Sequence, residues 1–115
     1  MEYLLMLYDD EAGFAALTPQ QQRDGVAAYV AYTQALEKAG ALRGANRLGG
    51  SSSATTVRTS NGKTQVHNGP FADSREQLGG YYLIDVPDLD AAIAWAARCP
   101  SAQHGIVEVR PVWAD

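Results

Sequence analysis

Two helix-forming segments, residues 18–40 and 87–100, alternate along the chain with short β-prone runs, and this order restricts the fold more than any other feature. Both segments carry apolar residues at three- and four-residue spacing, so each needs a surface on which to bury one face. Helices that connect strands in this way are typical of an α+β protein. The β-prone runs are residues 3–8, 41–48, 81–86 and 106–112.

The first helix has clear end signals. Thr18 is followed by Pro19 and, three residues on, by Gln21, which makes a capping box with proline at the first helical position. Gly40 predicts a left-handed stop. Gly25 costs about 1 kcal/mol relative to alanine inside a helix and therefore predicts close packing at that point. The stripe expected to face the core is Val26, Tyr29, Val30, Thr33 and Leu36.

The second helix is expected to begin after Asp88, a favourable N-cap, and to end at Pro100. Residues 101–105, "SAQHG", are expected to form an exposed loop that enters the last strand. The helix face predicted to be buried consists of Leu89, Ala92, Ile93 and Ala96.

Residues 55–67 predict a β-hairpin, because two β-prone runs flank Asn61-Gly62, a pair that favours a type I′ turn. Without this insertion the order is strand, helix, strand, strand, helix, strand. That order is the split βαβ of ferredoxin-like proteins. We therefore expect an antiparallel sheet with two helices on one face and an inserted hairpin.

The strand patterns also predict what covers the second face of the sheet. Residues 3–8 are consecutively apolar, as in a strand that is buried on both sides. In residues 81–86, Tyr82, Ile84 and Val86 form a core row, which leaves a mixed apolar and charged set on the opposite face. That set is Tyr81, Leu83, Asp85, Ile106, Glu108, Arg110 and Val112. A face of this kind favours a face-to-face homodimer that encloses a small cleft.

Composition excludes several classes of function. The 115 residues fit a single domain, residues 1–115, and nine basic against thirteen acidic residues give a net charge of −4. This balance opposes a nucleic-acid partner and an anionic membrane surface. The single cysteine, Cys99, permits no internal disulfide, and the apolar run 3–8 is too short for a signal peptide or a membrane span. We expect a cytoplasmic protein.

Three stretches together resemble the YCII-related family, in the branch named for a DGPF motif. They are "YLLMLYDD", "HNGPFADSREQLGGYYLIDVPDLDAAIAWA" and "VEVRPV". The resemblance implies a dimeric α/β barrel built from ferredoxin-like protomers. It also implies a family mostly of undefined function, with some dehydrochlorinase-like members that use a His-Asp pair and others encoded near extracytoplasmic sigma factors.

The sequence departs from the family pattern at two points. Asn68 stands where the motif has aspartate, and the first helix contains no histidine, since the two histidines are His67 and His104. The His-Asp pair of the enzyme-like relatives is therefore not carried over to residues of this chain.

The loop 68–80 has a structural interpretation throughout. Asn68-Gly69-Pro70 is turn chemistry, and Phe71 is expected to anchor the turn to the sheet or to a partner. Asp73 or Ser74 is expected to cap a single helical turn that Gly79-Gly80 ends. The functional alternative is that the loop borders a cleft and positions ligand groups.

His67 is the principal candidate for catalysis. A histidine suits proton transfer near neutral pH, and Asp73, Asp85 or Glu108 could act with it as acid and base. The alternative is an exposed edge histidine, because Lys63 and Gln65 lie on the same strand face. Two histidines in distant segments favour no metal site, and the sequence predicts no cofactor.

The ligand-binding prediction rests on the mixed sheet face. Tyr81, Asp85, Glu108 and Arg110, with Phe71 nearby, could hold a small acidic or phenolic compound. The alternative for the charged residues is a cross-strand or intersubunit ion pair. Three hypotheses follow: a homodimeric domain that binds a small organic ligand, a cofactor-independent lyase or isomerase that uses His67, and a regulatory interaction protein linked to extracytoplasmic sigma factors.

Overall fold

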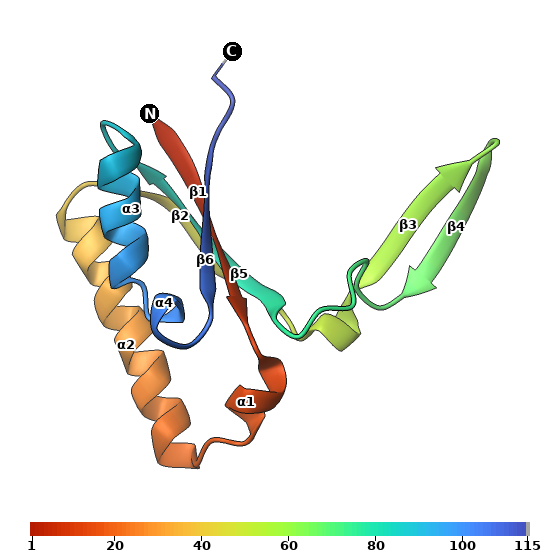
Figure 1. Cartoon of the computed structure of the whole chain (residues 1–115), viewed down its shortest axis with the longest axis horizontal. Helices are drawn as coiled ribbons and strands as arrows, with labels where there is room; N and C mark the ends of the chain where they lie inside the picture. The colour runs from red at the N-terminus through yellow and green to blue at the C-terminus, as the bar shows by residue number, and fades with distance from the viewer. Residues whose placement is uncertain (115) are drawn as a thin grey trace.

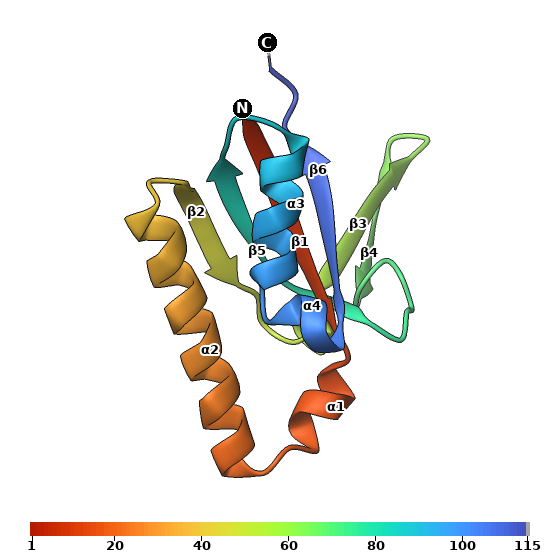
Figure 2. The ribbon, with the colours of Figure 1, turned by 60° about the vertical axis from the view of Figure 1, so that its left-hand side comes forward.

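The computed structural model describes residues 1–114 and contains a four-stranded antiparallel sheet in the order β2-β5-β1-β6 (Figure 1). The two longer helices lie on the same face of this sheet (Figure 2). With the hairpin set aside, this order and direction of strands confirm the predicted ferredoxin-like fold. The elements of this layer are β1 (Glu2–Asp9), α2 (Pro19–Lys38), β2 (Leu42–Arg47), β5 (Gln77–Asp85), α3 (Leu89–Arg98) and β6 (Ile106–Pro111).

Five further elements lie outside this layer. Strands β3 and β4 form a separate two-stranded sheet, which confirms the predicted hairpin, and the turn between them has positive φ at Asn61 and Gly62. The hairpin stands away from the four-stranded sheet (Figure 1). The two short helices α1 and α4 were not predicted, and the interpretation of residues 101–105 as a loop is wrong. The five elements are α1 (Glu11–Ala15), η1 (Ser51–Ser53), β3 (Thr55–Ser60), β4 (Lys63–Asn68) and α4 (Ser101–His104).

Helix α2 forms as its end signals predict, but its buried stripe is displaced. Thr18 and Gln21 make the capping box, and Gly40 has a φ of +71°. Tyr32 and Leu36 are buried, whereas Val26 and Val30 are half exposed, contrary to the prediction. The reason is that the first half of α2 extends beyond the sheet (Figure 2), so only its second half meets the core.

The close packing predicted at Gly25 is also wrong. A Cβ built on this glycine has no atom within 4 Å. Gly25 lies in the half of α2 that extends past the sheet, where the helix borders open space instead of another element.

The buried face of α3 is rotated from the predicted one. Ala92, Ala96 and Cys99 are buried, but Leu89 and Ile93 are about half exposed. Small side chains on the inner face let the helix approach the sheet closely, and the larger ones lie on its flank.

The loop before β5 differs from the prediction as well. No helical turn forms at residues 73–77; instead the Ser74 hydroxyl donates to the Glu76 carbonyl. The glycines expected to end that turn lie inside β5. A Cβ at Gly80 would lie 2.9 Å from the carbonyl oxygen of Asn46, so close approach of β2 requires glycine there.

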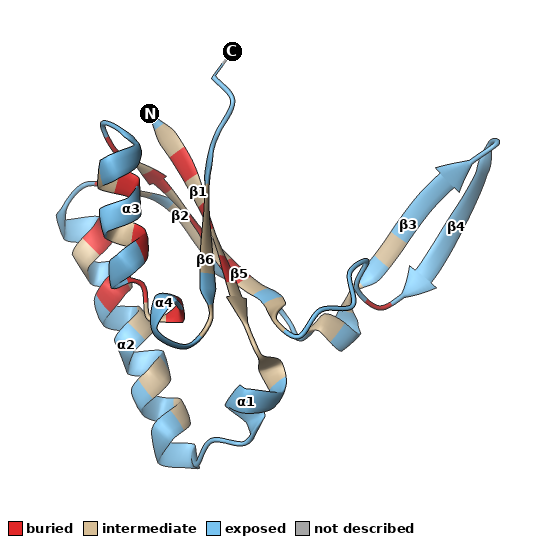
Figure 3. Cartoon of the chain, in the orientation of Figure 1, coloured by how far each residue is buried: buried red, intermediate tan, exposed pale blue. Residues whose placement is uncertain are grey.

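The core lies between the sheet and the helices (Figure 3). Its members are Tyr3, Leu5, Leu7, Tyr32, Leu36, Ala41, Tyr82, Ile84, Val86, Ala92, Ala96 and Cys99. Burial in β1 alternates: Leu4 and Met6 on the opposite face are only partly buried within the chain. The expectation that both faces of β1 are buried is therefore not met by a single copy.

Candidate functional site

The sheet face without helices, which we call the open face, brings together most of the predicted ligand-binding residues. Cross-strand pairing places Met6 between Tyr81 and Glu108, and places Leu4 between Leu83 and Arg110. Directly paired residues in a ladder point to the same face. The open face therefore has an apolar centre on β1 with polar groups on both flanks.

Hydrogen bonds fix the polar flanks. The Asn46 amide donates to the Tyr81 hydroxyl at 2.7 Å. On β6, Arg110 Nη2 lies 2.6 Å from Glu108 Oε2. This ion pair lies within one strand and is not the predicted cross-strand pair; it leaves most of the Arg110 side chain exposed.

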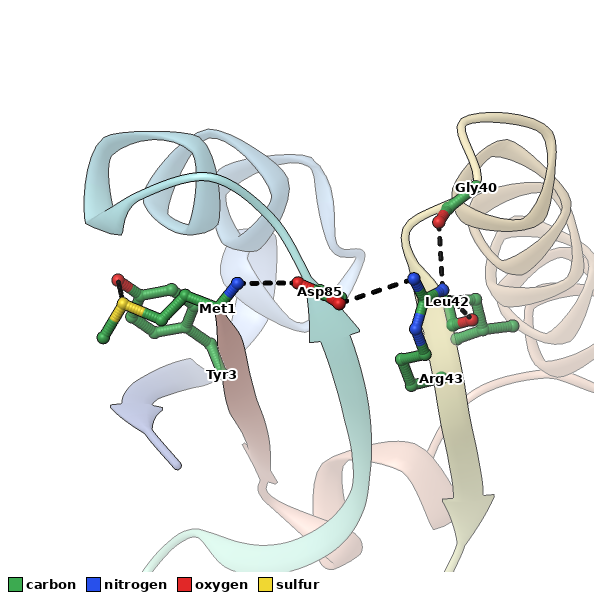
Figure 4. A network of polar contacts seen from close by, with 6 residues as sticks. All are labelled: Met1, Tyr3, Gly40, Leu42, Arg43 and Asp85. Carbon is green, nitrogen blue, oxygen red and sulfur yellow. Dashed lines mark hydrogen bonds and ion pairs between the residues drawn. The ribbon is translucent and has the colours of Figure 1, made fainter. Parts of the chain in front are cut away.

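Asp85 lies at one end of the open face and is held by two cations (Figure 4). The Met1 ammonium donates to Oδ1 at 2.7 Å, and Arg43 Nη2 lies 3.5 Å from Oδ2. The hydrogen bond from the ammonium lowers the pKa of Asp85, and the Arg43 charge adds to the effect. Asp85 thus serves as an anion at the rim.

The structure does not bring His67, Phe71 and Asp73 to the open face. His67 is exposed on β4, and Phe71 is 79% exposed, so it does not anchor the turn to the sheet. His67, Phe71 and Arg58 border a hollow of about 410 Å³ on the hairpin. Of the two histidines, both within the described residues, only His104 has a carboxylate oxygen within 4.0 Å. Catalysis by His67 and Asp73 stays a prediction.

Sequence reasoning missed a polar cluster where β1 ends beside α4. Ser101, which is fully buried, donates to Asp9 Oδ2 at 3.1 Å, and its oxygen lies 2.5 Å from the Tyr29 hydroxyl. His104 Nδ1 lies 3.0 Å from Asp9 Oδ1. Pairing of Tyr8 with Ile106 brings these segments together. The predicted antiparallel sheet did not specify that the first and last strands are neighbours, and it is this pairing that places Asp9 beside His104.

Burial tunes two groups next to this cluster. Desolvation raises the pKa of Tyr29 to about 12, although the Ser101 hydrogen bond opposes the rise. Burial likewise raises the pKa of the Cys99 thiol. Both groups therefore stay protonated near neutral pH. Among residues 1–114, no three His, Cys, Asp or Glu side chains are grouped closely enough to hold a metal ion.

Comparison with known protein families identifies the family of this chain. The sequence profile of the YCII-related domain matches residues 1–114. The chain belongs to the YCII-related family. It is 36% identical over 114 residues to the uncharacterized protein R00369 of Rhizobium meliloti strain 1021, and the match covers 97% of this chain and 92% of that protein. The assignment to the DGPF branch stays a prediction.

A solved structure has the same fold as this YCII-related chain. It is 5-chloro-2-hydroxyhydroquinone dehydrochlorinase from Burkholderia phenoliruptrix AC1100, in complex with 2,5-dihydroxybenzoquinone. The TM-score is 0.57 at 14% identity, with 100% of this chain and 96% of that chain covered. At this identity the likeness establishes the fold alone.

The arrangement allows two kinds of chemistry in this YCII-related domain. The open face offers a cation, a carboxylate and a phenol around an apolar centre, which suits binding. The Asp9 cluster offers a carboxylate beside an imidazole, which suits proton transfer. In the described part of the chain, no helix is both long and apolar enough to cross a membrane.

Proposed function

We propose that this YCII-related domain pairs with a second copy through its open face and binds a small organic ligand in the cleft between the two sheets. The observation that carries the proposal is the partly exposed apolar row at the centre of the sheet. Leu4, Met6 and Leu83 are accessible there, although they lie on the central strands. A second copy would remove this apolar surface from water.

The flanking groups favour a cleft over a solid interface. Sheets that pack face to face lie about 10 Å apart and need interdigitating side chains to fill the space. Here the flanks carry the Glu108–Arg110 ion pair and the Tyr81 hydroxyl, whose remaining N–H and O–H groups would lose water in a solid interface and would need further acceptors. A polar ligand between the two copies would pair with them.

The expected ligand is a small acidic or phenolic compound. The Arg110 guanidinium is largely exposed and can bind an oxyanion with two N–H groups, and the Tyr81 hydroxyl can donate to a second oxygen. The complex of the dehydrochlorinase with 2,5-dihydroxybenzoquinone supports this class, because that compound presents oxygens around a flat ring.

Sedimentation equilibrium tests the pairing. We expect the mass of two chains for the wild type and the mass of one chain for Met6→Lys, because the new ammonium would be buried between apolar rows. Ala94→Lys is the matched control, since Ala94 is exposed on α3, and it should keep the mass of two chains. A wild type that sediments as one chain at micromolar concentration would overturn the proposal.

Calorimetric titration with 2,5-dihydroxybenzoquinone tests the ligand. Loss of the guanidinium in Arg110→Met should weaken binding about tenfold or more. Arg23→Met makes the same change on the exposed side of α2 and should bind like the wild type. Equal binding by both variants would mean that the ligand does not bind at the open face.

A second candidate, a protein-interaction role, is favoured by exposed apolar side chains on the hairpin and on the loop that follows it. Val57 is 60% exposed, Val66 65% and Phe71 79%. An interaction role requires an apolar patch apart from the contact between the two copies. The double variant Val66→Asp, Phe71→Asp should then keep the mass of two chains. A fall to the mass of one chain would assign the patch to the homodimer instead.

A further inference from the structure

We propose that Asp9 and His104 form a second site, which accepts a proton from a neutral aromatic or enolic hydroxyl compound bound in the groove between α2 and α4. This site is separate from the open face and does not depend on the proposed pairing. It lies at the end of β1, on the helix-covered side of the molecule (Figure 2).

The direction of the hydrogen bonds fixes Asp9 as an acceptor. A serine hydroxyl has one proton, and Ser101 donates it to Asp9 Oδ2. The Tyr29 hydroxyl, 2.5 Å from Ser101 Oγ, must therefore be the donor in that contact. The order of donation therefore runs from Tyr29 to Ser101 to Asp9, and Asp9 Oδ2 is the final acceptor.

The other carboxylate oxygen of Asp9 lacks an aligned hydrogen-bond donor. Asp9 Oδ1 is shielded from solvent and has no aligned donor among the described residues, although His104 Nδ1 lies 3.0 Å away. The distance suits a hydrogen bond, and only the direction of the N–H does not. The His104 side chain is 60% exposed, so its ring has room to turn into line. Buried acceptors in folded proteins are nearly always paired, so this oxygen favours a proton on Nδ1.

A proton on Nδ1 leaves Nε2 as the free acceptor of the ring. The same logic fixes the tautomer of other carboxylate-held histidines. A ligand hydroxyl that reaches Nε2 can then pass its proton to the ring. The products are an oxyanion and an imidazolium whose two N–H groups face the ligand and Asp9; no other reactant is needed.

The groove has the size and lining for such a ligand. Its volume is about 670 Å³, within the range of small-molecule sites. Gly25, Ala28 and Ala35 form a low apolar wall along α2, and His104 of α4 also lines the groove. The space beside Gly25, where a Cβ would have no atom within 4 Å, is part of this groove.

The charges in the groove favour a neutral ligand that becomes an anion on binding. Arg98 borders the groove, and its guanidinium stacks over the Trp95 ring at 4.3 Å. It can stabilise the oxyanion. Asp24 also lines the groove and opposes a ligand that arrives with a full negative charge.

The tautomer of His104 gives the first test. Nitrogen-15 NMR of the imidazole should show the proton on Nδ1 in the wild type. Asp9→Asn should return it to Nε2, the form that dominates in free histidine side chains. Asp90→Asn, an equal change on the exposed face of α3, should leave the His104 signals unchanged. A wild-type His104 protonated on Nε2 alone would overturn the proposal.

Binding of 4-nitrophenol gives the second test, because its absorption reports loss of the hydroxyl proton. The wild type should bind it and shift it toward the phenolate. His104→Gln should abolish the shift and weaken binding about 10- to 100-fold. Gly25→Leu should block binding by filling the groove, while a better helix former at this position preserves the fold. Binding that survives both changes would overturn the groove as the site.

Discussion

The two faces of the same sheet contrast sharply, although they are built from the same strands. On the helix-covered face, Leu5 and Ile84 have no exposed area. Their sequence neighbours Leu4 and Leu83 point the other way and stay partly exposed. Successive side chains of a strand point to opposite faces. Alternate residues of one strand therefore stabilise the core, and the residues between them remain available for contacts with other molecules.

The largest expected difference between the faces is in the free energy of unfolding. Ile84→Ala should cost about 2–5 kcal/mol, because it leaves a cavity under the helices. Leu83→Ala should cost about 1 kcal/mol or less in the single chain, since the side chain is already partly hydrated. Urea unfolding followed by tryptophan fluorescence measures both.

Measuring the unfolding free energies of these two variants at several protein concentrations separates the two faces further. If a second copy covers the open face, the cost of Leu83→Ala should grow as concentration rises, because only the paired form buries Leu83. The cost of Ile84→Ala should not. Equal costs for the two variants at low concentration would contradict the assignment of one face to the core.

Removing a tyrosine hydroxyl from each face should give a smaller difference in the free energy of unfolding. Tyr32 is buried and donates to the Trp95 carbonyl at 2.8 Å, so Tyr32→Phe leaves that oxygen unpaired and should cost about 1–2 kcal/mol. Tyr81→Phe on the open face should cost about 0.5 kcal/mol or less, because water can replace the hydroxyl for Asn46. Thermal unfolding of the two variants compares them directly, and a larger loss from Tyr81→Phe would be the contrary result.

High pH should weaken the helix-covered face selectively. The pKa of Tyr29 is raised from 10.0 to about 12 by burial. Between these values the unfolded chain has lost the phenol proton and the folded chain retains it. The contribution of Tyr29 to stability is therefore complete below pH 10 and falls as the pH rises toward 12. Unfolding free energies of wild type and Tyr29→Phe should converge or cross over this range, whereas a constant difference would oppose a raised pKa.

Most of the layered fold could be predicted from the sequence because its signals are local. The capping box at Thr18 and the turn at Asn61-Gly62 act within a few residues and formed as predicted. The alternation of Tyr82, Ile84 and Val86 reported the buried face correctly. The register of the strands then followed from which side chains had to be buried.

The predictions from sequence that were wrong concern residues whose burial depends on the neighbouring elements of the fold. Val26 and Val30 continue the apolar stripe of α2, but the sheet ends before it reaches them. The helical turn predicted near Asp73 depended on capping residues alone, and the loop adopts other hydrogen bonds.

The cluster around Asp9 was missed for a different reason. Asp9 and His104 are remote in sequence, and each has unremarkable neighbours. They meet because β1 and β6 pair and because Gly105 lies against the backbone of Tyr8, where any Cβ would collide with the carbonyl oxygen. Three-dimensional register, and not a motif, creates that cluster.

The smallest expected effect concerns the rim of the open face. The Met1 ammonium lowers the pKa of Asp85 below its usual value of 3.8. A lowered carboxyl pKa adds stability above the unfolded value, and that stability is lost as the pH falls through the folded pKa. The difference in unfolding free energy between wild type and Asp85→Asn should therefore shrink below pH 3.8.

Glu37→Gln, on the exposed side of α2, is the control and should show a smaller change over the same range. Because the side chain of Asp85 is over a third exposed, salt should also reduce the difference. Insensitivity to both acid and salt would mean that this rim contact contributes nothing, and the contrast between the faces would then be one of apolar burial alone.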